Sequence, residues 1–132
     1  MIKSCRVKDF MQTNLVTINA EMEMMEAVRI MVEHGVSGVP VVDEQNNLIG
    51  IITEKDCMNI VLNASYYNEW GGSVKEFMST EVESVDDNMS LTDISEKFIR
   101  GPYRRFPVAD NGRLVGQVSR HDVLKVLLSL AE

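Results

Sequence analysis

A chain of 132 residues has the length of one ordinary domain, and it can bury a hydrophobic core without disulfides or a structural metal. Hydrophobic residues make up 45% and charged residues 25% of it, which excludes extensive disorder, and the net charge of −7 argues against general nucleic-acid binding. No apolar run approaches the roughly 20 residues of a transmembrane helix, and the start, Met1-Ile2-Lys3-Ser4-Cys5-Arg6, does not resemble a signal peptide. We expect a cytoplasmic protein that binds neither membranes nor nucleic acid.

The sequence repeats itself after 67 residues. Val7-Lys8-Asp9-Phe10-Met11 aligns with Val74-Lys75-Glu76-Phe77-Met78, and Val39-Pro40-Val41-Val42-Asp43 aligns with Phe106-Pro107-Val108-Ala109-Asp110. One deletion changes the shift to 66, after which Thr53-Glu54-Lys55-Asp56 aligns with Ser119-Arg120-His121-Asp122. The chain is therefore interpreted as two repeats, 1–66 and 67–132.

Each repeat begins with a predicted strand and an amphipathic helix. Residues 15–18 form a short β-rich run in the first repeat. A helix is predicted after it, because five apolar residues follow at i, i+3, i+4, i+7 and i+8: Met24, Ala27, Val28, Met31 and Val32. Glu21, Glu23 and Glu26 suit the opening turns of this helix, and Gly35 is placed to end it.

Two apolar strands and a closing helix complete the repeat. Residues 39–42 and 48–53 are predicted to pair antiparallel, and the equivalent joint of the second repeat contains Asn111-Gly112, a strong hairpin signal. The closing helices carry matching apolar faces: Cys57, Ile60, Val61 and Ala64 in the first repeat, and Val123, Val126, Leu127 and Leu130 in the second. Residues 63–73 are expected to be a connecting loop whose aromatic residues pack back over the fold.

These elements predict an α/β (α+β) fold of two β-α-β-β-α repeats. A three-stranded sheet with two helices leaves one apolar sheet face uncovered, so the two repeats are expected to dock through their sheets.

A Gly-x-x-(Thr/Ser)-x-x-Asp motif runs from a strand into the closing helix of both repeats, and it has two interpretations. As a capping box, Thr53 and Ser119 cap the helices, and Asp56 and Asp122 return the hydrogen bond; spacing alone favours this interpretation. As a binding site, the aspartate accepts hydrogen bonds from a ribose diol, while the hydroxyl and the free amides of the first helical turn face an anion. The glycine lets the strand approach a neighbour or a ligand closely.

The motif and the strand proline together resemble the cystathionine-β-synthase (CBS) domain, whose tandem pairs form a Bateman module. The resemblance covers about residues 7–63 and 74–131, and it rests on residues 37–43 and 104–110, each followed by the glycine, hydroxyl and aspartate motif. It implies pseudo-twofold symmetry and two clefts between the repeats that hold AMP, ADP, ATP or a related adenosyl compound such as S-adenosylmethionine.

The resemblance also assigns residues to these clefts. It implies that Asp56 and Asp122 hold the ribose hydroxyls and that Thr53 and Ser119 lie by the ribose and phosphate. The implied adenine pocket is formed by Thr17, Ile18, Val39, Pro40, Ser84, Val85, Phe106 and Pro107.

Basic residues distinguish the second repeat. Residues 97–125 contain seven Lys or Arg and two acidic residues, although the chain as a whole is acidic. Guanidinium groups bind phosphate oxygens in pairs, so we expect phosphate contacts from Arg104, Arg105 and Arg120. His121 is interpreted either as a phosphate contact or as a solvent-facing residue, and no metal site is predicted because the two histidines lack ligand spacing.

No catalytic motif accompanies these features, so an enzyme is not expected. The leading hypothesis is a regulatory sensor that binds an adenosine nucleotide and signals through assembly or through an unidentified partner protein. The resemblance implies a homodimer paired through helices. The alternative is a ligand-free dimerisation or docking scaffold that keeps the fold and the capping boxes.

Overall fold

The computed structural model describes residues 4–132. Residues 1–3, which begin the predicted first repeat and the stretch compared with a signal peptide, lie outside the described residues. The chain divides into two compact units, which we name by the repeat that supplies their sheet. The first-repeat unit is Val16–Val82, and the second-repeat unit is Glu83–Glu132 together with the described residues up to Leu15. Each unit therefore contains the opening segment of the other repeat.

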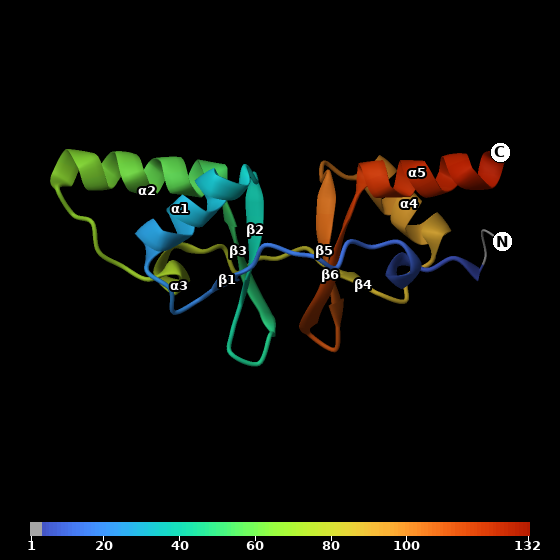
Figure 1. Cartoon of the computed structure of the whole chain (residues 1–132), viewed down its shortest axis with the longest axis horizontal. Helices are drawn as coiled ribbons and strands as arrows, with labels where there is room; N and C mark the ends of the chain where they lie inside the picture. Colours follow the sequence, from blue (N-terminus) through green and yellow to red (C-terminus); the bar gives the residue numbers. More distant parts are fainter. Residues whose placement is uncertain (1–3) are drawn as a thin grey trace. The chain divides into compact units, whose positions relative to one another are not determined.

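The first-repeat unit has one three-stranded sheet in the order β1-β2-β3, with β1 parallel and β3 antiparallel to β2. Its long helices lie on the same side of this sheet (Figure 1). Its elements are β1 (Ile18–Asn19), α1 (Met24–His34), β2 (Gly38–Val42), β3 (Leu48–Thr53), α2 (Glu54–Tyr67) and α3 (Val74–Phe77).

The second-repeat unit has the same topology, with the sheet order β4-β5-β6. Its elements are η2 (Val7–Asp9), β4 (Val85–Asp86), α4 (Leu91–Arg100), β5 (Arg105–Asp110), β6 (Arg113–Ser119) and α5 (Arg120–Ala131). The predicted order of strand, helix, strand, strand, helix is confirmed in both units. The first strand is shifted from the predicted run 15–18, because Ile18 and Asn19 are the residues that pair with Val41 and Val42. The short turns η2 and α3 were not predicted.

Local sequence explains the ends of these elements. Gly35 ends α1 with φ of 62°, and its N–H donates to the carbonyl of Met31. The β5–β6 hairpin turns at Asn111 and Gly112, which both have positive φ, as the Asn-Gly signal predicted. In α1 the apolar stripe is only partly covered: Met31 is buried, whereas Val32 is 76% exposed.

Each unit has its own hydrophobic core. The first-repeat core is formed by Ile18, Ala20, Met24, Ala27, Met31, Val39, Val41, Ile52, Cys57 and Val74. The second-repeat core is formed by Val7, Val85, Leu91, Ile94, Phe98, Phe106, Val108, Val118 and Val123. Val74 and Val7 come from the opening segment of the other repeat and are completely buried, so each core needs a residue from that segment.

The predicted connecting loop at 63–73 was partly wrong. Helix α2 continues to Tyr67 and ends at Asn68, which takes a left-handed conformation with φ of 57°. Tyr66 and Tyr67 are 79% and 64% exposed and contact each other edge to face, instead of packing back over the fold. They extend outward because they occupy helical positions after Ala64, the last buried residue of α2.

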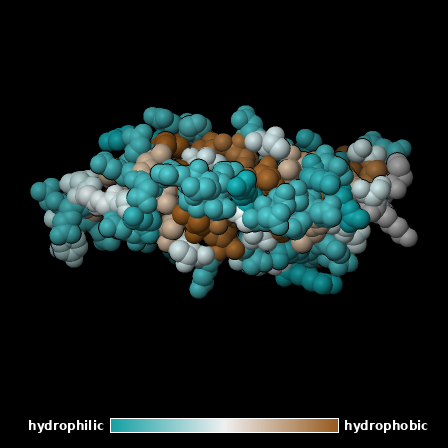
Figure 2. Space-filling view, turned by 90° about the horizontal axis from the view of Figure 1, so that it is seen from below, coloured by the Kyte–Doolittle hydropathy of each residue, from teal (hydrophilic) through white to brown (hydrophobic). Residues whose placement is uncertain are grey.

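Hydrophobic side chains also reach the surface elsewhere, and Figure 2 shows hydrophobic patches between largely hydrophilic side chains. Within residues 4–132, no helix has the length and apolar character needed to cross a membrane.

Candidate functional site

The two strand-to-helix corners carry capping boxes. At the β3–α2 corner, the Asp56 N–H donates to Thr53 Oγ1 at 3.3 Å, and the Thr53 N–H donates to Asp56 Oδ2 at 3.0 Å. At the β6–α5 corner, the Asp122 N–H donates to Ser119 Oγ at 3.1 Å, and the Ser119 N–H donates to Asp122 Oδ2 at 2.9 Å. The capping interpretation is therefore correct at both corners, and each cap uses only one oxygen of the carboxylate.

The remaining carboxylate oxygens differ between the corners. Asp56 Oδ2 accepts from the Thr53 hydroxyl at 2.9 Å as well as from the Thr53 N–H. Both hydrogen bonds to the Asp56 carboxylate therefore fall on one oxygen. Asp122 Oδ1 accepts from Gln12 Nε2 at 3.1 Å. Gln12 was not predicted as a site residue, because it lies 110 positions from Asp122 and no pattern within either repeat connects the two.

The glycine of each motif makes room for a neighbouring segment. A Cβ added to Gly50 would lie 2.5 Å from Met78 Sδ, and one added to Gly116 would lie 2.5 Å from Met11 Sδ. The backbone pairs beside these contacts: Gln12 exchanges two hydrogen bonds with Gln117, at 2.8 and 2.9 Å. Of the two roles considered for the glycine, the structure supports close approach of a neighbour.

The residues of the implied adenine pocket divide into core and surface residues. Ile18, Val39, Val85 and Phe106 are at most 3% exposed and belong to the hydrophobic cores. Pro40 and Pro107 are also buried, on β2 and β5, whereas Thr17 and Ser84 are exposed immediately before β1 and β4. The core side chains are directed into their own unit, so their contribution to a ligand would come from backbone groups.

The three arginines predicted to contact phosphate lie at the β6–α5 corner. Arg105 pairs with Ser119 across the sheet, and the carbonyl of Arg104 accepts from the N–H of Arg120 at 2.9 Å. Arg120 Nη2 donates to the carbonyl of Gly101 at 3.1 Å and to that of Phe98 at 3.5 Å, so it also caps the end of α4. Arg104, Arg105 and His121 are exposed.

The equivalent positions at the β3–α2 corner are uncharged. Ser37, whose carbonyl accepts from the Glu54 N–H, takes the place of Arg104, and Gly38, which pairs with Thr53, takes the place of Arg105.

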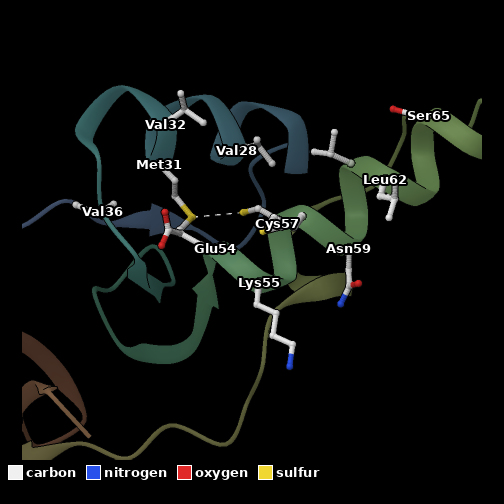
Figure 3. A pocket seen from close by; sticks show the side chains of 12 residues that line it. Val28, Met31, Val32, Val36, Glu54, Lys55, Cys57, Asn59, Leu62 and Ser65 are labelled. Atoms are coloured by element: carbon white, nitrogen blue, oxygen red, sulfur yellow. Dashed lines mark hydrogen bonds between the residues drawn. The ribbon is translucent and has the colours of Figure 1, made fainter.

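Each unit also has an open apolar groove on its helices. The groove between α1 and α2 has a volume of about 850 Å³, and Val28, Val32 and Leu62 line it (Figure 3). Cys57 lies at its base and donates from Sγ to Met31 Sδ at 3.5 Å. Burial raises the pKa of the Cys57 thiol, and Asp56 and Glu54 raise it further, so the thiol stays protonated at neutral pH. A smaller groove of about 410 Å³ lies between α4 and α5.

Comparison with known proteins identifies the repeats. The sequence model of the CBS domain matches residues 7–63 and 74–129. The chain is 38% identical to the CBS domain-containing protein YhcV of Bacillus subtilis over 89% of its own length and 81% of YhcV. It is 30% identical to the uncharacterized protein MJ1225 of Methanocaldococcus jannaschii over 92% of its own length, but it spans only 42% of that protein.

Solved structures show the same architecture. The crystal structure of CBSX2 in complex with AMP has a TM-score of 0.80 at 26% identity, with 97% of this chain and 99% of that chain covered. The CBS domain pair of MJ0100 in complex with 5′-methylthioadenosine and S-adenosyl-L-methionine has a TM-score of 0.70 at 26% identity, with 95% and 97% covered. The chain therefore belongs to the CBS domain family and carries two copies of that domain in tandem.

Proposed function

We propose that this chain is a regulatory module that binds an adenosine compound at its two motif corners and signals through assembly or a partner protein. The observation that carries the proposal is the geometry of the motif aspartates. Each caps its helix through Oδ2, so the second carboxylate oxygen, Oδ1, takes no part in the cap. A carboxylate oxygen beside a helix N-terminus and a hydroxyl is suited to a ribose diol and an adjacent phosphate.

Two further observations support this assignment. Arg105 and Ser119 pair on adjacent strands, so an arginine stands next to the Asp122 corner, and guanidinium groups bind phosphate oxygens. CBSX2 and the MJ0100 domain pair, both CBS structures, bind AMP and S-adenosylmethionine with 5′-methylthioadenosine respectively. The ligand class that we propose is AMP, ADP, ATP or S-adenosylmethionine. The role is non-catalytic: the motif residues bind and orient.

Thermal unfolding with and without each of these compounds at millimolar concentration tests the proposal. A ligand that binds only the folded protein stabilises it by about 2.7 kcal/mol at a hundredfold excess over its dissociation constant. We expect such a shift with an adenosine compound and none with GTP. If none of the four compounds shifts unfolding, the ligand-free scaffold replaces the sensor.

Single-site variants separate binding from capping. Asp56→Asn and Asp122→Asn remove the charge but keep an oxygen for the cap, so each should reduce the ligand shift while lowering stability by no more than about 1 kcal/mol. The matched control is Glu76→Gln: Glu76 accepts from the Ser73 N–H at 2.8 Å in another capping box, outside the motif. An equal loss of ligand shift in the control would contradict a role of the motif aspartates in binding.

We also propose that the module assembles as a homodimer through its helix grooves. Equivalent positions of the two repeats expose the same kind of side chain: Val32 and Ile99, Met58 and Leu124, and Leu62 and Leu128, each between 60% and 83% exposed. One chain thus offers two related apolar faces, and a second copy offers two matching ones. The two grooves differ in charge at one pair of equivalent positions. Glu54 lines the groove of the first-repeat unit, whereas Arg120 lines that of the second-repeat unit.

Sedimentation equilibrium tests this assembly. The wild-type protein should have twice the mass of one chain, and Leu62→Glu should convert it to a monomer because a charge would be buried in the contact. The stability of the monomeric unit should change by no more than about 0.5 kcal/mol, since Leu62 is exposed there. Tyr66→Glu, at an exposed apolar residue outside the groove lining, is the control and should remain dimeric. A wild-type monomer would exclude the dimer.

A further inference from the structure

The two motif aspartates are inequivalent because of one side chain from the opening segment of the chain. Gln12 Nε2 donates to Asp122 Oδ1 at 3.1 Å. The backbone of Gln12 is held by its two hydrogen bonds to Gln117, and the preceding Met11 packs against Gly116. The amide therefore reaches Asp122 from a backbone position that is held by its own pairing and by the preceding methionine.

The first-repeat unit, residues 16–82, has no counterpart of this amide beside Asp56. The residue equivalent to Gln12 is Ser79, whose backbone makes the same paired contact with Ile51, at 2.9 and 3.0 Å. A serine hydroxyl is shorter than a glutamine amide and does not bond Asp56 in this structure. Within residues 4–132 the structure gives Asp56 Oδ1 no hydrogen-bond donor, because both side-chain bonds to this carboxylate fall on Oδ2.

This difference affects the binding of a diol. A carboxylate has about four acceptor positions, two on each oxygen, and the two hydroxyls of a ribose occupy two of them. Asp56 offers both positions of Oδ1. Asp122 also has two open positions, but they are divided: one on Oδ1 beside the amide of Gln12, and one on Oδ2, which already accepts from the Ser119 N–H in the cap. Both positions of Oδ1 become open to the diol only when the amide of Gln12 leaves.

We infer that Gln12 competes with the ribose diol for Asp122, so that the Asp56 site fills first and Gln12 sets the affinity of the Asp122 site. The inference rests on the proposed function, since the competing ligand is an adenosine compound with a free 2′,3′-diol. Gln12 acts here as a specificity-determining residue that does not itself hold the ligand. Its exposure and its backbone pairing mean that the side chain can be changed without removing a core contact.

Calorimetric titration of single-site proteins tests the inference. Asp56→Asn leaves the Asp122 site, and Asp122→Asn leaves the Asp56 site; each is titrated with AMP and, separately, with S-adenosylmethionine. Wild-type protein should bind in two steps, and the Asp122 site should be the weaker one. In the Asp56→Asn background, Gln12→Ala should tighten binding about three- to tenfold, the factor that one net hydrogen bond represents.

Two further variants separate the hydrogen bond from other effects. Gln12→Met keeps the length of the side chain but removes the donor, so it should tighten binding as Gln12→Ala does. Ser79→Ala in the Asp122→Asn background is the matched control and should leave binding unchanged.

The outcomes distinguish the inference from the function on which it rests. If neither AMP nor S-adenosylmethionine binds the wild-type protein, the proposed function fails for these ligands, and the inference fails with it. If both sites bind with equal affinity and the Gln12 variants have no effect, only the inference is wrong. Weaker binding after Gln12→Ala would also overturn it, because Gln12 would then be a ligand contact.

Discussion

Asp43 organises the turn between β2 and β3 through its carboxylate. Its Oδ1 accepts from the N–H groups of Gln45 and Asn47, at 3.0 and 2.9 Å, and its Oδ2 accepts from Asn47 Nδ2 at 3.0 Å. These hydrogen bonds, those from Asn47 first, lower the pKa of Asp43 below its ordinary value of 3.8. The turn is therefore held by the charged form of this residue.

The lowered pKa predicts a pH-dependent contribution to stability. The contribution is fully present above the unfolded-state pKa and is lost as the pH falls through the lower folded-state pKa, because protonation removes acceptors. The difference in the free energy of unfolding between wild-type protein and Asp43→Asn should be constant near neutral pH and should shrink in acid. Urea unfolding from pH 7 to pH 3 measures it.

A control in the same turn makes this measurement specific. Glu44 neighbours Asp43 and is exposed, so Glu44→Gln should differ little from the wild-type protein in the pH dependence of its stability. If the difference for Asp43→Asn were the same at pH 3 as at pH 7, the hydrogen bonds would not depend on the charge of Asp43.

At the scale of elements, strands β3 and β6 each need a glycine where the opening segment of the other repeat crosses. An added Cβ would meet a backbone carbonyl as well as the methionine sulfur. On Gly50 it would lie 3.0 Å from the carbonyl oxygen of Ser79, and on Gly116 it would lie 3.0 Å from the carbonyl oxygen of Gln12. The methionine can rotate away, but the carbonyls belong to paired backbone and can move little. At both glycines, the distances from an added Cβ to the sulfur and to the carbonyl oxygen are shorter than ordinary van der Waals contacts.

We therefore predict that Gly50→Ala and Gly116→Ala each lower the free energy of unfolding by about 1 to 3 kcal/mol, the usual cost of overpacking. Gly71→Ala is the matched control: a Cβ there meets nothing within 4 Å, so its effect should stay within about 0.5 kcal/mol. Chemical denaturation of the three variants compares them. Wild-type stability in Gly50→Ala would mean that the segment at Met78 moves aside at no cost.

The same elements show what the sequence alone could predict. The helix stripes, the Gly35 cap, the Asn111-Gly112 turn and both capping boxes depend on residues within a few positions of each other, and all of them were predicted. The partners of the motif glycines and the Gln12 contact to Asp122 depend on which sheet an opening segment joins. The repeat aligns Val7 with Val74, but that alignment fits a segment packed on its own repeat equally well.

At the scale of the whole molecule, the sequence repeats and the compact units differ in one segment. Residues 1–66 contain the sheet and helices of the first repeat but lack Val74, a completely buried member of that core, and lack Ser79, which pairs with Ile51. Residues 16–82 contain every buried member of the same core. The fragment that corresponds to a structural unit is thus 16–82 and not the sequence repeat.

This difference predicts the behaviour of fragments. A peptide of residues 16–82 should unfold cooperatively on heating, whereas residues 1–66 alone should not, because its core lacks the contribution of the α3 segment. Mixing 1–66 with 67–132 should restore cooperative unfolding, since each fragment supplies the opening segment that the other lacks: Val7 for the second-repeat core and Val74 for the first. Circular dichroism during heating measures all three samples. If 1–66 alone melted as cooperatively as 16–82, the buried Val74 and the segment that carries it would contribute nothing essential to the first-repeat unit.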